Sequence, residues 1–267
     1  MKNIKILMYA ITALLAIAIV GCSGSKTQMA VENGSSNGAS PSLKEYVVAT
    51  DASYAPFESL TEKNEFVGFD IDIVKAIADK GGFKVRLVNT PWEGMFATLT
   101  NGDRDILISA ITITEERSKE MDFSEPYFEA KQSIAAGKDS PVIKFEDLKG
   151  KKVGVHTGTT GDIVVTDLLG KDSKDVIRFE NTPLALKELE NGGVEAVVAD
   201  NGVVNNYVNN NSDKGLMTVE DESFDKEFYG LVVKKGNKEL VDMINEGLKK
   251  IKADGTYDEI YKKHFGE

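Results

Sequence analysis

The chain has 267 residues, with 43 acidic and 32 basic side chains, and its formal net charge at pH 7 is −11. This acidity argues against a nucleic-acid partner, because phosphate binding requires clustered lysine and arginine. One cysteine and two histidines exclude an internal disulfide pair and argue against a Cys- or His-based metal site.

The first segment has the pattern of a secretory signal. Lys2 and Lys5 precede an apolar run over residues 6–20, which is short for a membrane span. The run ends in Val20-Gly21-Cys22, which resembles the lipobox of bacterial lipoproteins and implies lipidation of Cys22. The alternative is an ordinary signal peptide with an unrelated cysteine. Residues 1–21 are therefore expected to be removed, and the Ser-, Gly- and Asn-rich residues 22–42 to form a flexible tether.

Strand and helix patterns alternate along the rest of the chain. The expected strands are Tyr46–Thr50, Phe83–Val88, Ile106–Ser109, Lys152–Val155, Val176–Phe179, Val194–Ala199 and Gly230–Val233. Amphipathic helices lie between them, and two more, Glu239–Lys252 and Thr256–His264, close the chain. This alternation predicts an α/β fold with mostly parallel sheets.

Two stretches, residues 99–110 and 189–200, match each other position for position. Each reads as a helix end, a glycine break, an acid and a buried strand. Any helix-to-strand turn explains this pattern, and so do two similar α/β lobes. Ligands of open α/β sheets bind beyond the carboxyl ends of the strands. Two lobes would therefore place Ser109, Ala110 and Asp200 at equivalent strand ends that face one cleft.

A hydroxyl-bearing loop and an arginine follow the strand Ile106–Ser109. Thr114 is predicted to cap a short helix, and Arg117 lies one turn inside it, so its guanidinium can point back over Thr112. A guanidinium offers a planar fork of donors that matches a carboxylate. We therefore predict a site for a small zwitterion here. The alternative is a surface helix in which Arg117 pairs with a neighbouring glutamate.

Other candidate ligand residues also follow predicted strands. Asp51 follows the first strand and precedes Tyr54, although a turn acid explains it equally well. Trp92 offers a ring face to a cationic or planar group, or else it covers the core. Residues 155–161 run from a strand end to a helix start, where free amides suit an anion, but they lack the P-loop spacing. No nucleophile motif accompanies His156, so it is not predicted to be a catalytic base.

Several stretches together resemble the solute-binding proteins of bacterial ABC importers, specifically the polar amino-acid family, family 3. They are Thr50–Phe57, Val67–Asp72, Ser109–Arg117, Met121–Tyr127, Gly150–Val155, Gly158–Gly161 and Asp254–Tyr257. The resemblance implies a two-lobe, type II periplasmic-binding-protein-like fold, with each lobe a mostly parallel sheet flanked by helices. Lobe 1 would comprise residues 43–132 and 226–267, and lobe 2 residues 133–225. Two crossover strands would join them near residues 130–135 and 224–229.

The resemblance also implies how a free L-amino acid is held. Arg117 would clamp the α-carboxylate, assisted by the backbone amides of Ala110 and Thr160. The α-ammonium would be held by a carbonyl, a hydroxyl and a carboxylate, from Ser109, Thr112 and Asp200.

Four further residues would surround the ligand side chain. Tyr54 and Trp92 would sandwich it, Asp51 would meet its polar end, and His156 occupies a position that varies within the family. Asp51 leaves one negative charge beyond the zwitterion, which favours arginine, lysine or histidine. A protonated His156 would repel such a cation, and a neutral His156 would suit glutamine, which is the alternative ligand.

By this resemblance the protein is an extracytoplasmic substrate-binding lipoprotein, anchored to the cell membrane, that closes on its ligand and delivers it to an ABC permease. It is expected to act as a monomer, without a cofactor or metal and without enzymatic activity. An enzyme such as a small-acid dehydratase on the same fold is one alternative, and it would need a general acid in the cleft. A sensor domain that feeds a receptor is another.

Overall fold

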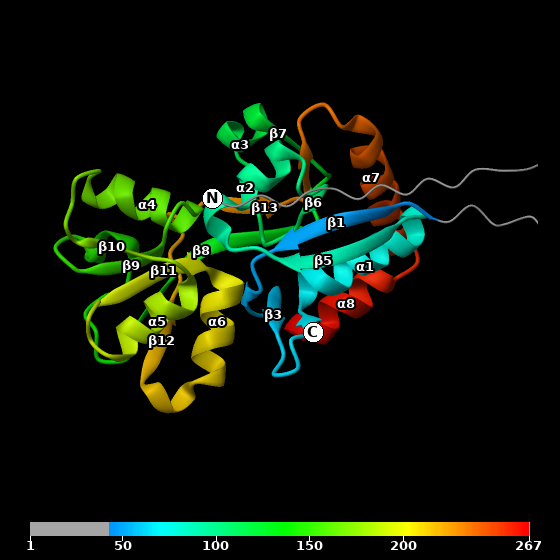
Figure 1. Cartoon of the computed structure of the whole chain (residues 1–267). Coiled ribbons are helices and arrows are strands. Elements are labelled where there is room, and N and C mark those ends of the chain that lie inside the picture. Colours follow the sequence, from blue (N-terminus) through cyan, green and yellow to red (C-terminus); the bar gives the residue numbers. More distant parts are fainter. Residues whose placement is uncertain (1–42, 267) are drawn as a thin grey trace, which may run out of the picture. The chain divides into compact units, whose positions relative to one another are not determined.

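The computed structural model describes residues 43–266 (Figure 1). The predicted signal peptide, Cys22 and the tether lie outside the described residues. Within 43–266, no helix is both long enough and apolar enough to cross a bilayer.

The first sheet has the strand order β5-β1-β6-β14-β7. Its strands are β5 (Lys84–Asn89), β1 (Glu45–Thr50), β6 (Ile106–Leu107), β14 (Val232–Lys234) and β7 (Met121–Phe123). The accompanying helices are α1 (Phe69–Gly81), α2 (Trp92–Asn101), α3 (Glu115–Glu120), α7 (Lys238–Ala253) and α8 (Thr256–Phe265). A small antiparallel sheet is formed by β2 (Ser53–Tyr54), β3 (Glu58–Leu60) and β4 (Phe66–Val67).

The second sheet has the order β10-β9-β11-β8-β12. Its strands are β10 (Val176–Phe179), β9 (Val153–His156), β11 (Ala196–Asp200), β8 (Phe128–Gly137) and β12 (Leu216–Val219). The helices α4 (Thr160–Leu169), α5 (Thr182–Glu190) and α6 (Asn201–Asn210) pack on this sheet, and two short 3₁₀ turns, η1 (Phe145–Leu148) and η2 (Ser212–Lys214), complete this part of the chain. In Figure 1 these elements are green to yellow.

The two sheets repeat one topology. In each sheet one strand, β1 or β9, lies parallel between the next two strands that the chain adds to that sheet, which are β5 and β6 in the first sheet and β10 and β11 in the second. The strands β6 and β11 belong to the two stretches whose sequences match. The structure therefore confirms that the match reflects two similar α/β units.

Each sheet is mixed: the first has two parallel and two antiparallel pairings, and the second has two parallel and three antiparallel pairings. The antiparallel pairings arise where the chain passes from one sheet to the other. Such a strand, β8 or β14, enters its new sheet from the side of the cleft, and it therefore runs against strands whose carboxyl ends face that cleft. The first part of β8 also pairs with β13 (Lys226–Tyr229). The expected crossovers at residues 130–135 and 224–229 overlap these two strands.

Helices α1 and α7 approach each other closely at Gly247. A Cβ atom at this position would lie 2.4 Å from the Ile77 carbonyl oxygen in α1, so a larger residue must push the helices apart. We expect Gly247→Ala to lower the free energy of unfolding by about 1–3 kcal/mol, despite the higher helix propensity of alanine.

Urea denaturation measures this loss, with Glu246→Ala as the control on the exposed side of the same helix. An unchanged midpoint for Gly247→Ala would mean that the two helices separate without cost.

Candidate functional site

A pocket lies where the carboxyl ends of the parallel strands of both sheets meet. The structure brings all of the sequence-predicted ligand residues to its wall, and these are Asp51, Tyr54, Trp92, Ser109, Ala110, Thr112, Arg117, His156, Thr160 and Asp200. Ser53 and Thr159 also line it. Strand-end position was the sequence signal for Asp51, Ser109 and Asp200, while the other residues were predicted from loop and helix positions and from the family resemblance.

Arg117 is held over the pocket by helix α3. Thr114 caps this helix, as predicted, because its hydroxyl accepts a bond from the Arg117 amide at 3.2 Å. The Arg117 Nη1 donates to the Thr112 carbonyl oxygen at 2.8 Å, and the guanidinium carbon lies 5.3 Å from the centre of the Trp92 ring. Burial lowers the pKa of Arg117, while the charges of Glu227 and Asp200 act in the opposite direction.

The alternative of a surface arginine paired with a glutamate of its own helix does not describe this geometry. Neither Glu115 nor Glu120 forms an ion pair with Arg117 in the described part of the chain. Arg117 instead lines the pocket.

Thr112 presents two further groups to the pocket. It forms an antiparallel bridge with Tyr229, and the two bonds of that bridge run from the Ile113 amide to Phe228 and from the Gly230 amide to Ile111. In such a pair, the amide and carbonyl of the central residue point away from the partner strand. The Thr112 carbonyl accordingly accepts from Arg117, and the Thr112 amide has no partner within residues 43–266.

Two buried acids accept hydrogen bonds from the chain corner at Ser109 and Ala110. The Ala110 amide donates to the Asp70 carboxylate at 2.7 Å, and the Ser109 hydroxyl donates to Glu58 at 2.7 Å. Burial raises the pKa of Asp70 to about 6 and also raises that of Glu58. The Ala110 amide was expected to meet the ligand carboxylate, and this expectation is wrong for the geometry observed, because Asp70 already occupies that donor. Ala110 has a φ of 47°, in the left-handed region, and this bond to Asp70 stabilises the corner.

Asp200 ends β11 and lies in a dense network of hydrogen bonds. Its carboxylate accepts bonds from the Tyr229 hydroxyl and from Gln132 Nε2, and its amide donates to the Tyr54 hydroxyl at 3.4 Å. Burial, followed by the nearby charge of Glu227, raises the pKa of Asp200 to about 6. At pH 7 the carboxylate is therefore ionised, and it is available to a cation.

The opposite part of the pocket combines an acid with rings. Asp51 accepts a bond from the Ser53 hydroxyl at 2.9 Å and one from the Trp92 amide at 3.0 Å. The centres of the Trp92 and His156 rings are 5.8 Å apart. Burial lowers the pKa of His156, although the charge of Asp51 opposes this effect. His156 is therefore neutral at pH 7 and does not repel a cation.

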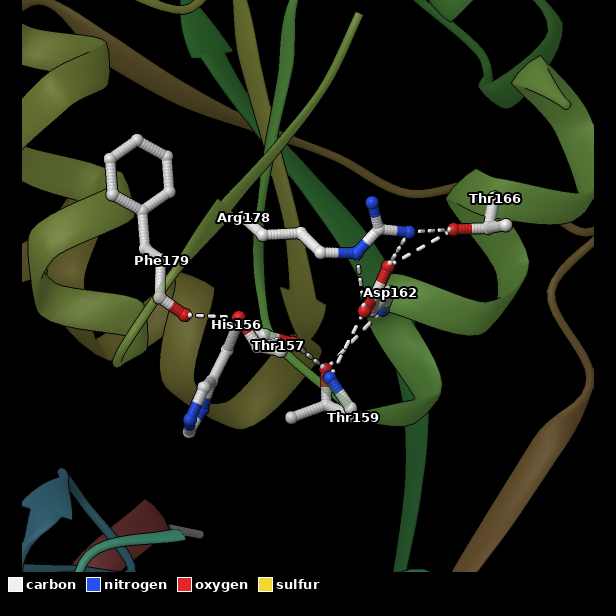
Figure 2. Close-up of polar contacts among 8 residues, drawn as sticks. His156, Thr157, Thr159, Asp162, Thr166, Arg178 and Phe179 are labelled. Carbon is white, nitrogen blue, oxygen red and sulfur yellow. Dashed lines mark hydrogen bonds and ion pairs between the residues drawn. The ribbon is translucent and has the colours of Figure 1, made fainter. Parts of the chain in front are cut away.

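The loop from His156 to the start of α4 is braced on the side away from the pocket. Figure 2 shows the Asp162 carboxylate beside Arg178, with Nε of Arg178 at 3.0 Å, and the Thr157 hydroxyl bonded to the Phe179 carbonyl oxygen at 3.0 Å. Thr159 caps α4 by accepting the Asp162 amide at 3.3 Å.

This bracing leaves the first amides of α4 free for a ligand. In the described residues the amides of Thr160 and Gly161 have no partner, as expected at a helix start. They carry the positive end of the helix dipole, which suits an anionic group.

Two residues beside the pocket were missed by the sequence analysis, Gln132 on β8 and Glu227 on β13. Gln132 Nε2 donates to Asp200 and to Glu227, the latter at 2.9 Å. Both residues lie inside the segments expected to cross between the lobes. The sequence signal that could have identified them was a polar side chain in each of the two strands expected to cross between the lobes.

The comparisons with known proteins agree with this geometry. The sequence pattern of the bacterial extracellular solute-binding proteins, family 3, matches residues 46–267. A probable histidine-binding protein of Neisseria gonorrhoeae is 44% identical over 266 residues, which covers 99% of this chain and 97% of that protein.

Two solved structures are similar along most of the chain. The arginine-, lysine-, histidine-binding protein ArtJ from Geobacillus stearothermophilus superimposes with a TM-score of 0.81 at 45% identity, covering 84% of this chain and 96% of that one. An ancestral arginine-binding protein bound to glutamine gives a TM-score of 0.78 at 46% identity, covering 84% and 98%. With its two-lobe fold and its pocket at the strand ends, the chain belongs to the bacterial extracellular solute-binding proteins of family 3.

Proposed function

We propose that this protein captures one free L-amino acid with a positively charged side chain, arginine, lysine or histidine, and passes it to the permease of an ABC importer. The observation that carries the proposal is the presence of Arg117 and Asp200, two groups of opposite charge, on the wall of one pocket. Arg117 lies on α3 in the first lobe and Asp200 at the end of β11 in the second, so a zwitterion that bridges them also holds the two lobes together. A ligand of this kind stabilises the closed state because it binds that state more tightly.

The two ends of the zwitterion meet complementary groups. Arg117 faces the α-carboxylate, together with the free amides of Thr112 and Thr160. The α-ammonium meets the Asp200 carboxylate, the Thr112 hydroxyl and the Ser109 carbonyl. Hydrogen bonds to charged groups contribute about 1.5–3 kcal/mol each, and an unmatched buried charge costs at least as much. The pocket therefore selects against molecules that lack either group.

The side-chain end of the pocket favours a cation. With Arg117 and Asp200 matched to the zwitterion, Asp51 adds one negative charge that a guanidinium, ammonium or imidazolium group neutralises. Tyr54 and Trp92 offer ring faces to the same group. Neutral His156 accepts or donates a hydrogen bond without repelling it.

Glutamine is the second candidate. Both Asp51 oxygens already accept bonds, from Ser53 and from the Trp92 amide, and this lowers their demand for a cation. A neutral His156 also suits a side-chain amide, and a related ancestral protein has been solved with glutamine bound.

Calorimetry of the full chain in detergent against the twenty amino acids tests the proposal and ranks the candidates. Unfolding and refolding the protein first removes any ligand that co-purifies. Micromolar or tighter affinity for arginine, lysine or histidine supports the proposal, and preference for glutamine replaces it with the second candidate. Absence of binding to every amino acid would refute both.

We also propose the location and the anchor. The chain would act outside the cytoplasmic membrane, held there by lipid on Cys22, because the residues before Cys22 have the pattern of a lipoprotein signal. The related proteins described above are named for binding, which supports a carrier without turnover. Incubation with cyclic acids, followed by product analysis, would detect a dehydratase.

The affinity is expected to fall in acid. The α-ammonium pairs with ionised Asp200, whose pKa is raised to about 6 in the free protein. Affinity is therefore full above this pH and falls as the pH drops below about 6, because a proton then competes with the ligand, by up to about tenfold per pH unit. Titrations with arginine, whose groups do not titrate in this range, measure the effect. Constant affinity between pH 4.5 and 7 would contradict the pairing.

A further inference from the structure

A third carboxylate, that of Glu227, lies behind the proposed ammonium site. Its Oε2 accepts a bond from the Thr112 hydroxyl at 2.6 Å and one from the Thr160 hydroxyl at 2.9 Å, while its Oε1 accepts from Gln132 Nε2 at 2.9 Å. Thr112 follows a strand of the first sheet, and Thr160 opens helix α4 on the second. Glu227 thus binds a hydroxyl from each lobe.

We infer that Glu227 is a positioning residue for ligand specificity, which accepts a hydrogen bond from the Thr112 hydroxyl and thereby fixes the Thr112 oxygen as an acceptor for the ligand α-ammonium. This inference rests on the proposed function, and it adds a residue that touches the ligand only through others.

A hydroxyl has one donor and two acceptor positions, and its proton rotates toward the best acceptor. Bonded to the Glu227 carboxylate, the Thr112 proton points away from the pocket, and the oxygen lone pairs remain for an ammonium. An ionised carboxylate is a strong and exclusively accepting partner. A glutamine at position 227 would offer its own N–H groups and leave the hydroxyl direction undefined.

Gln132 links Glu227 to Asp200. Its Nε2 donates to both carboxylates and lies 3.1 Å from the Thr160 hydroxyl oxygen. Two anionic oxygens around one amide nitrogen fix the orientation of that amide, because the oxygen end would be repelled. The carboxylates of Glu227 and Asp200 are therefore held side by side, and a cation between them is stabilised by both.

The charge of Glu227 also acts on the titration of Asp200. The groups that face Asp200 are Glu227 and Tyr229 on β13, Tyr54 on β2, Gln132 on β8, and the Arg117 charge from α3. Of these, Glu227 is the negative neighbour that raises the pKa of Asp200. Removing the Glu227 charge therefore lowers the pKa of Asp200. The pH range in which acid weakens ligand binding, here called the acid limb, should then move to lower pH.

The test compares wild type, Glu227→Gln and Glu129→Gln as full chains. Glu129 lies on the paired strand β8, exposed and bonded to Lys226 at 2.7 Å, so its variant removes the same charge outside the pocket. Calorimetry uses L-arginine and its des-amino analogue 5-guanidinopentanoate, and in parallel L-glutamine and 4-carbamoylbutanoate. For Glu227→Gln we expect at least about tenfold weaker binding of the amino acid, unchanged or stronger binding of the analogue, and an acid limb at lower pH.

A purely structural role for Glu227 predicts a different pattern. Both the amino acid and its analogue would then lose affinity equally, without a shift of the acid limb, and this result overturns the inference. Affinities, analogue ratio and acid limb that all match wild type overturn it as well, while the proposed function stands. Failure of the wild type to bind any amino acid overturns both.

Discussion

Replacing Arg117 by alanine is expected to weaken binding of the amino acid by about 100-fold or more. The substitution removes the pair of hydrogen bonds that the guanidinium is proposed to donate to the α-carboxylate, and each bond to a charged group is worth about 1.5–3 kcal/mol. Arg117→Lys should lie between alanine and wild type, because it keeps the charge but loses the planar fork. Calorimetry with the ligand of the wild type measures all three proteins.

Arg86→Ala serves as the matched control for this loss. Arg86 lies on β5, half exposed, and its Nε is 3.6 Å from Glu45, a surface pair of little energetic weight. Its variant should bind as wild type does. Wild-type affinity in Arg117→Ala would show that the guanidinium is not the carboxylate clamp.

The second large effect is expected for Asp200→Asn, which preserves shape and removes the charge. Amino-acid affinity should fall by about 100-fold or more, since the ammonium loses its ionised partner. The decline of affinity below pH 6 should disappear with it. The thermal midpoint at pH 7 should stay the same or rise, because the pKa of Asp200 is raised in the folded state and ionisation of this carboxylate therefore opposes folding at that pH.

Weaker binding together with an unchanged or higher thermal midpoint separates a binding defect from misfolding. Asp200 begins α6 but makes no side-chain bond to the helix amides, so little cap energy is lost. Asp213→Asn, an exposed change in the same part of the chain, is the control. A lower midpoint together with retained pH dependence would assign Asp200 a structural role instead.

The sequence predicted the positions of the pocket residues well, because they depend on local patterns. Asp51, Ser109, His156 and Asp200 each come at or directly after a buried strand, and parallel strands bring their carboxyl ends to one edge. The helix cap at Thr114, which orients Arg117, is likewise a local signal.

What escaped prediction depends on long-range geometry. The Ala110 amide is occupied by a hydrogen bond to Asp70, a buried acid 40 residues away, and Ala110 has a left-handed φ at this point. The place of Glu227 follows from the antiparallel register that sets it opposite Ala130, which no local periodicity fixes. The charge state of His156 depends on burial, which the sequence alone does not determine.

The repeated strand order has an evolutionary consequence. In the proposed function, Asp51 and His156 at the ends of β1 and β9 face the ligand side chain, whereas Ser109, Thr112 and Arg117 after β6 and Asp200 at the end of β11 hold the α-carboxyl and α-amino groups. Recognition of what all amino acids share is thus separated, strand by strand, from recognition of what distinguishes them. Proteins with this fold can therefore change the amino acid that they bind through substitutions at the ends of the equivalent strands β1 and β9. The groups that hold the α-amino and α-carboxyl groups then stay the same.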